Sequence, residues 1–137
     1  MSLLTTSHTN SIASLYLTSL LTWSQLPTLL ALNSERLTES YSVLARAFQQ
    51  WNIEFVTPTD GIFVFAKLAR NARTFKDEAA AFERLAEQGV VVSPGRFFHG
   101  VETDLGWARI RFSIPLGVMN VAVKRIGLFF ESEGYAV

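Results

Sequence analysis

The apolar and polar positions of the chain repeat in two different periods, and each period predicts a different kind of element. Apolar residues three or four positions apart predict amphipathic helices: Leu37, Tyr41, Leu44 and Phe48 in one segment, and Met119, Ala122, Val123, Ile126 and Phe130 in another. Two runs rich in β-branched and aromatic residues, NIEFVTP and IFVFAKL, predict strands that a TDG turn joins into a hairpin.

The segment after the hairpin predicts a third helix and two further strands. Thr74 and Asp77 have the spacing of a capping box, and Gly89 supplies a left-handed stop. The inner stripe of this helix is expected at Ala79, Phe82, Leu85 and Ala86. VVVS predicts a short buried strand ending at Pro94, and GWARIRFSIP predicts the next strand. This order predicts an α+β fold in which helices pack on one face of a small, mostly antiparallel sheet.

The first part of the chain carries no formal charge before Glu35. Residues 12–32, IASLYLTSLLTWSQLPTLLAL, predict a long apolar N-terminal helix buried against protein, and Asn33 or Ser34 is expected to cap the next helix. A helix on or in a membrane is the alternative, but polar residues interrupt the segment and no basic signal-peptide region precedes it. We therefore expect an interdomain or oligomer-forming helix over 1–33, a domain over 34–137, and no membrane partner.

Composition narrows the classes of partner. With 137 residues the chain has the size of one domain, and its 12 basic and 12 acidic residues leave no net charge to attract nucleic acid. The lack of cysteine excludes disulfides and thiolate metal sites, and His8 and His99 lack the spacing of metal ligands, so no metal is expected. The absence of cysteine and of a signal peptide favours a cytoplasmic location.

Candidate chemistry begins in GWARIRFSIP. In a strand, alternation places Ala108, Ile110, Phe112 and Ile114 on one face and Trp107, Arg109, Arg111 and Ser113 on the other. The planar fork of an arginine guanidinium matches a carboxylate through two parallel hydrogen bonds, and a neighbouring indole can shield such an ion pair from water. Ordinary solvent-facing arginines on an open sheet are the alternative for both positions.

The loop SPGRFFHG, before that strand, is the second candidate. Arg96, Phe97, Phe98 and His99 are expected to form a pocket rim, with His99 as the candidate for proton transfer. The alternative is that the two phenylalanines cover the core. At the start of the chain, TTSHTN (residues 5–10) predicts either ligand-binding hydroxyls and backbone N–H groups or a plain helix N-cap.

Three segments together resemble one known family. Residues 33–130 include the hairpin segment, FERLAEQGVVVSPGRFFHG and GWARIRFSIP, in the order found in the C-terminal small domain of fold-type I pyridoxal-phosphate enzymes. The signature is an SPGxxF turn followed by a GW-x-R-x-x-F strand. It is most similar to class I/II aminotransferases, particularly aminocyclopropane-carboxylate synthases and the fungal proteins similar to them. Residues 1–32 resemble the helix that leads out of the large domain in this family.

The resemblance implies a role for Arg109, which falls where the family's strand arginine binds the substrate α-carboxylate. Arg96 and Arg111 depart from the family pattern, which usually has small or apolar residues there. The extra cations imply either a dicarboxylate or phosphate-bearing ligand, or a surface no longer shaped by amino-acid catalysis. The expected substrate-binding residues are therefore Arg109, Trp107, Arg111 and Arg96.

The cofactor site of the family lies in the large domain, which the resemblance does not cover. Lys67, Lys76 and Lys124 match none of the positions of the family's cofactor lysine. A chain without that lysine does not hold the cofactor covalently. We therefore expect no cofactor-binding residue here, and pyridoxal phosphate only if another chain supplies a large domain.

Three hypotheses of function follow. The first is a truncated or split aminotransferase-like small domain that binds a carboxylate-bearing ligand through Arg109 and is not an autonomous transaminase. Its partner would be a second copy of the chain or a large-domain chain. The second is a stand-alone, cofactor-independent biosynthetic enzyme that reuses the fold on an acidic substrate. The third is a non-catalytic partner or regulatory module.

Overall fold

The computed structural model describes residues 11–98 and 104–135 of the chain. The elements follow one another as α1 (Ser11–Leu21), α2 (Leu26–Gln50), β1 (Phe55–Val56), β2 (Phe63–Lys67), α3 (Phe75–Glu87), β3 (Ser93–Pro94), η1 (Gly95–Phe97), β4 (Trp107–Arg111) and α4 (Leu116–Ser132). The order of helices and strands expected from the sequence is confirmed, with the short 3₁₀ turn η1 in addition. The chain divides into two units, Met1–Glu35 and Arg36–Val137.

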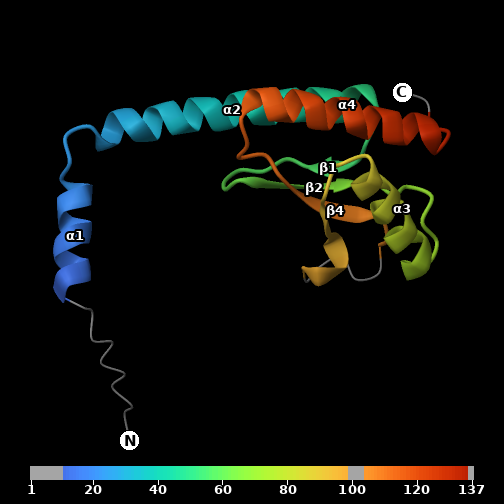
Figure 1. The fold of residues 1–137 in the computed structure, drawn as a ribbon, viewed down its shortest axis with the longest axis horizontal. Coiled ribbons are helices and arrows are strands. Elements are labelled where there is room, and N and C mark those ends of the chain that lie inside the picture. Colours follow the sequence, from blue (N-terminus) through green and yellow to red (C-terminus); the bar gives the residue numbers. More distant parts are fainter. Residues whose placement is uncertain (1–10, 99–103, 136–137) are drawn as a thin grey trace, which may run out of the picture. The chain divides into compact units, whose positions relative to one another are not determined.

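Within the described residues of the second unit, four strands form one sheet in the order β1-β2-β4-β3 (Figure 1). Each neighbouring pair is antiparallel. Arg109 in the central part of β4 pairs with Phe65 of β2 on one side and with Ser93 of β3 on the other. The predicted α+β class with a small antiparallel sheet is confirmed, and β4 lies inside the sheet with a neighbour along each edge.

One face of the sheet forms the hydrophobic core. The second half of α2 and all of α4 lie on this side of the sheet in Figure 1. The strands contribute Val64, Ala66, Ala108 and Ile110, and the helices contribute Leu44, Phe48, Met119, Ile126, Phe129 and Phe130. Because alternate residues of a strand point to opposite faces, the burial of Ala108 and Ile110 directs Trp107, Arg109 and Arg111 to the other face.

Helix α3 begins with the predicted capping box. The Thr74 hydroxyl accepts a hydrogen bond from the Asp77 N–H, and the Asp77 carboxylate accepts one from the Thr74 N–H. The predicted inner stripe is partly wrong, because the buried residues are Glu78, Ala81, Phe82 and Leu85, whereas Ala86 is exposed. A carboxylate therefore lies inside the protein at Glu78, where an apolar stripe was expected.

The prediction of one long apolar helix over 12–32 is wrong. Helix α1 ends at Leu21, a turn follows, and α2 runs without interruption from Leu26 through Asn33 and Ser34, which therefore cap no helix. Pro27 explains the break, because its ring excludes the hydrogen bond to residue 23 and is tolerated only in the first turn of a helix. Among the described helices, none has the length and apolar character that crossing a membrane requires.

The described part of the first unit, residues 11–35, exposes most of its large apolar side chains. No residue of α1 is buried, and Ile12, Leu15 and Tyr16 are each more than 70% exposed, at 75%, 72% and 75%. The expectation of an interdomain or oligomer-forming segment therefore stays a prediction, since no partner protein is present in the structure. Exposed apolar side chains that lie close together are typical of a surface that contacts another protein.

The strand predicted at VVVS is shorter and lies further along the chain. Only Ser93 and Pro94 pair with β4, while Val90 is buried and Val91 is 86% exposed. The 3₁₀ turn η1 begins at Gly95, directly after β3. Because Ser93 and Pro94 pair with Arg109 and Ala108, η1 starts beside the middle of β4.

Candidate functional site

The three candidate residues of β4 lie on one face but in different surroundings. Trp107 is buried, Arg109 is half-buried and Arg111 is exposed. Among these three side chains, burial decreases from Trp107 through Arg109 to Arg111. The middle position combines a permanent positive charge with partial removal from water, where an ion pair is stronger than at the surface.

The Arg109 guanidinium lies against two phenyl rings. Its Cζ atom is 4.1 Å from the ring centroid of Phe63 and 3.9 Å from that of Phe98. Both contacts are within the range of a cation–π interaction. The buried Nε atom of Arg109 has no hydrogen-bond partner in the described part of the protein. A buried donor without an acceptor costs free energy, so Arg109 is poised to pair with an anion that the described residues do not provide.

The aromatic surroundings extend beyond these two rings. Phe65 pairs with Arg109 across the sheet, and its ring meets that of Phe98 edge to face at 5.7 Å. Phe63, Phe65 and Phe98 are all half-buried, so part of each ring faces solvent. The surface around the guanidinium is therefore apolar and lowers the local dielectric constant, which strengthens the attraction of Arg109 for a carboxylate.

Trp107 is held by an ion pair at the end of β2. Its Nε1–H donates to Asp104 Oδ2 at 2.7 Å, and Lys67 Nζ lies 2.5 Å from Asp104 Oδ1. The Lys67 ammonium, and after it the Trp107 indole, lowers the pKa of the Asp104 carboxyl below its ordinary value of 3.8. Asp104 therefore fixes the orientation of the Trp107 indole beside Arg109.

Arg96 forms a separate cluster with α3. Its Nη1 atom lies 3.5 Å from Glu78 Oε1, and its Cζ atom lies 5.2 Å from the ring centroid of Phe97 and 5.8 Å from that of Phe75. Glu78 also accepts a hydrogen bond from the Gly106 N–H at 2.8 Å. The structure thus places Arg96 against the buried carboxylate of Glu78, where its charge is already balanced.

Two glycines allow the chain to approach β4 closely. A Cβ atom on Gly95 would lie 2.7 Å from the Trp107 Cβ atom, and one on Gly106 would lie 2.2 Å from the Ala69 carbonyl oxygen. Gly106 also has a φ of +90°, a conformation that side chains disfavour. The close approach at Gly95 places η1 against the start of β4, and so brings Phe98 over Arg109. The approach at Gly106 places the start of β4 against the segment that follows β2.

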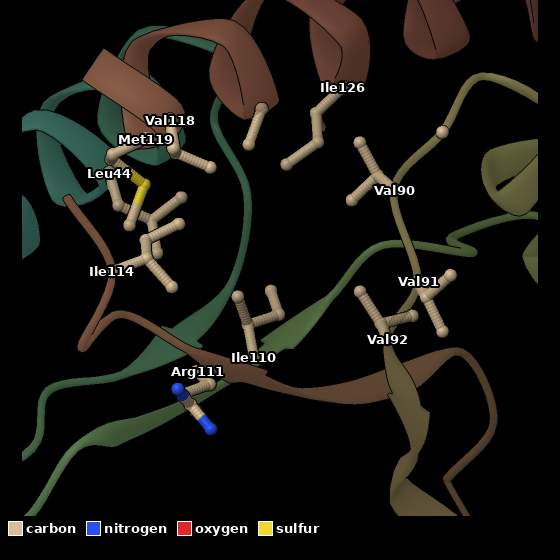
Figure 2. Close-up of a pocket in the computed structure, with 12 residues that line it drawn as sticks. Leu44, Val90, Val91, Val92, Ile110, Arg111, Ile114, Val118, Met119 and Ile126 are labelled. Atoms are coloured by element: carbon tan, nitrogen blue, oxygen red, sulfur yellow. The ribbon is translucent and has the colours of Figure 1, made fainter. Parts of the chain in front are cut away.

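Arg111 is directed away from the apolar interior. Figure 2 shows the cavity next to it, of about 250 Å³, between α4, the segment before β3 and β4. Ile110, Ile126 and Val90 point into this cavity, whereas the Arg111 guanidinium points away from it. Arg111 is the one charged residue among the described residues that line the cavity, and the others are almost all aliphatic, so the interior of the cavity is apolar. The cavity is a feature of the core side of the sheet, opposite the face of Arg109.

The remaining candidate residues predicted from the sequence differ in whether and where the structure places them. His99 and the TTSHTN segment lie outside the described residues. Phe97 and Phe98 do not belong to the core cluster, so the alternative that both cover the core is wrong. Phe97 is 67% exposed and lies over Arg96, whereas Phe98 lies over Arg109. Phe63 was not predicted as a site residue, although its place in an aromatic strand of the hairpin was the signal available.

The family model for class I and II aminotransferases matches residues 3–126. Two fungal relatives are similar over almost the whole chain. The "probable aminotransferase aclI" of Aspergillus oryzae is 35% identical over 92% of this chain and 30% of its own length. The "probable aminotransferase sirI" of Leptosphaeria maculans is 34% identical over 91% of this chain and 30% of its own length. The chain thus spans less than a third of these relatives.

Solved structures of aminotransferases have the same fold. An aminotransferase from Mycobacterium tuberculosis is 25% identical, has a TM-score of 0.67, and shares 80% of this chain and 28% of its own. A mutant of Thermus thermophilus aspartate aminotransferase, complexed with tryptophan, is 21% identical with a TM-score of 0.73, over 88% of this chain and 30% of its own. At this level of identity the second likeness concerns the fold alone.

Proposed function

This chain belongs to the class I and II aminotransferase family, and we propose that it acts as the small domain of such a protein and binds a carboxylate-bearing ligand through Arg109. The single observation that carries the proposal is the environment of the Arg109 guanidinium. It is half-buried, lies against two phenyl rings and has a buried Nε atom without a partner in the described residues. A carboxylate lying in the plane of the guanidinium would accept charge-assisted hydrogen bonds from its N–H groups.

The neighbouring residues have graded roles in this proposal. Trp107, held by Asp104, excludes water from one side of the Arg109 carboxylate site. Arg111 follows on the same face and is exposed, so it attracts an anionic ligand without fixing its orientation. Arg96 contributes less than the sequence suggested, because Glu78 balances its charge. His99, as a proton-transfer group, remains a proposal from the sequence alone.

The described residues do not fit pyridoxal phosphate, the family's cofactor, on their own. Lys67 is paired with Asp104, and Lys76 and Lys124 are exposed on α3 and α4. An amine that reacts with the cofactor needs an enclosed site, whereas these three lysines are paired with a carboxylate or exposed to solvent. We therefore propose that this chain alone is not a transaminase, and that a large domain elsewhere would hold the cofactor.

The exposed apolar surface of the first unit supports a protein partner. Ile12, Leu15 and Tyr16 would be covered by an aminotransferase-like large domain, and a second copy of this chain is the alternative occupant. The 30% coverage of the fungal relatives agrees with a protein that needs a further part to form a complete site.

The test of the proposal compares two ligands that differ only in charge. 3-Phenylpropanoate presents a carboxylate on an apolar body, and 3-phenylpropanamide has the same body without the charge. Isothermal titration calorimetry should detect binding of the carboxylate, and Arg109→Gln should weaken it about tenfold or more, since a hydrogen bond to a charged group contributes about 1.5–3 kcal/mol. Arg111→Gln is the matched control and should change the Kd much less. Equal affinity for both ligands, or an unaffected Arg109→Gln variant, would reject the proposal.

A second experiment tests the absence of autonomous cofactor chemistry. Borohydride reduction after incubation with pyridoxal phosphate should give no stoichiometric adduct at a single lysine. A single modified lysine in the mass spectrum of the digested protein would contradict this part of the proposal.

A further inference from the structure

We propose that Phe63 and Phe98 are positioning residues that hold the Arg109 guanidinium in one plane, so that a carboxylate reaches it only through its N–H edge. The inference deepens the proposed function and rests on it. It concerns the two phenyl rings, one from a strand of the hairpin and one from the loop after η1, that come together only in the folded sheet.

The geometry of the guanidinium determines where the rings lie. Three nitrogens surround its Cζ atom within the plane, so a ring whose centroid is 3.9 or 4.1 Å from that carbon must lie above or below the plane. The N–H groups point outward within the plane and are not covered by such a contact. The rings therefore block the approaches that offer no hydrogen bond, so a carboxylate can pair with the guanidinium only within its plane.

The two rings are themselves held in place. Phe63 pairs with Arg111 in the register of β2 and β4, which fixes its backbone two register positions away from the Phe65–Arg109 pair. Phe98 donates its backbone N–H to the Gly95 carbonyl at 2.8 Å, and its ring meets Phe65 edge to face. A long, flexible side chain between two such rings loses its rotational freedom before any ligand arrives, and this lowers the entropic cost of binding.

The neighbouring loop residue provides a matched control. Phe97 is adjacent to Phe98 and also lies over an arginine, but that arginine is Arg96, which is paired with Glu78. The inference assigns the positioning of Arg109 to Phe98 and not to Phe97. The same phenylalanine-to-leucine change at these two positions should therefore have different effects on Arg109.

The direct test is nuclear magnetic resonance of the ¹⁵N,¹³C-labelled full chain, which reports rotation about the Nε–Cζ bond of each arginine. Exchange between the two Nη nitrogens of Arg109 should be slower than for the exposed Arg111. Phe98→Leu should accelerate the Arg109 exchange about two- to fivefold, as expected for loss of one cation–π contact, and Phe98→Tyr should restore the slow rate. Phe97→Leu should leave Arg109 unchanged. If Phe98→Leu lacks a dispersed spectrum, Phe63→Leu takes its place with the same expectation.

Binding of 3-phenylpropanoate separates this inference from the proposed function. Phe98→Leu should raise the Kd about two- to fivefold, whereas Arg109→Gln should remove most of the binding. If the wild-type chain does not bind the carboxylate, the proposed function is wrong, while the exchange rates still decide whether the rings hold the guanidinium. The inference is overturned if Arg109 rotates as fast in the wild type as in Phe98→Leu, or if Phe97→Leu has the same effect.

Discussion

The Glu78 carboxylate accepts a hydrogen bond from the backbone N–H of Gly106 at 2.8 Å, and this contact ties α3 to the start of β4. Glu78 is 2% exposed and its other oxygen lies 3.5 Å from Arg96 Nη1. One buried carboxylate thus joins the helix, the loop after β3 and the strand that carries Arg109. The precision of the Arg109 site depends on residues that do not contact a ligand there.

Removing this carboxylate should destabilise the second unit. Glu78→Ala leaves the Gly106 N–H without its acceptor and Arg96 without its counter-charge, so the free energy of unfolding should fall by about 1–3 kcal/mol. Glu78→Gln keeps an acceptor oxygen and should cost less. Urea titration measures the free energy of unfolding of each variant. Glu83→Ala, at an exposed position of the same helix, is the control. An equal, small effect of all three changes would show that Glu78 carries no such role.

Two of the left-handed glycines, Gly61 and Gly106, should respond differently to a methyl group. Gly61→Ala introduces strain at a φ of +85°, but nothing lies within 4 Å of the new atom, so we expect a cost of about 1–2 kcal/mol. Gly106→Ala adds a clash at 2.2 Å with the Ala69 carbonyl oxygen and should cost about 1–3 kcal/mol more. Thermal unfolding of the two variants provides the comparison. A Gly106→Ala protein as stable as Gly61→Ala would contradict the close approach of these backbones.

The anchoring of Trp107 should be lost in acid. Lys67 and Trp107 lower the pKa of Asp104, so its folded-state pKa is below the unfolded value of 3.8. A depressed carboxyl pKa stabilises the fold above the unfolded pKa, and this contribution is lost as the pH falls through the folded pKa. The Trp107 indole N–H resonance should therefore stay constant from pH 7 to about pH 5 and shift only below about pH 4. A transition centred above pH 5 would contradict this assignment, and Asp104→Asn should remove the transition.

The exposed apolar residues of the first unit should determine self-association when no other partner is present. Replacing Ile12, Leu15 and Tyr16 together by serine should shift the chain toward the monomer in analytical ultracentrifugation. Leu128→Ser changes an exposed leucine of α4 and serves as the control on the second unit. An unchanged sedimentation distribution in the triple variant would show that this surface does not mediate association.

The local features of the fold could be predicted from the sequence because they depend on neighbouring residues. Period-2 alternation placed Ala108 and Ile110 in the core and Arg109 on the opposite face, and the capping box of Thr74 and Asp77 was found from its spacing. The helix break near residue 23 was also accessible, because Pro27 is incompatible with the middle of a continuous helix. The error there came from giving the apolar character of the segment more weight than its proline.

The surroundings of the site could not be predicted in the same way. The contact of Phe98 with Arg109 depends on β3 lying beside β4, and the contact of Phe63 depends on β2 lying on the other side. Glu78 was not expected in the interior, because charged residues are rarely buried without partners and its partners, Arg96 and Gly106, are distant in sequence. Long-range pairing therefore decided that Arg96 has a carboxylate partner, whereas Arg109 has none among the described residues.

The central claim, that Arg109 is the carboxylate anchor, is tested most directly by its own Nε–H resonance during a ligand titration. Addition of 3-phenylpropanoate should shift the Arg109 Nε–H signal in a saturable way, leave the Arg96 signal unchanged and shift the Arg111 signal only slightly. The amide analogue should leave all three signals unchanged. Saturable shifts centred on Arg111 or Arg96, or the same Arg109 shift with the uncharged amide, would contradict the claim.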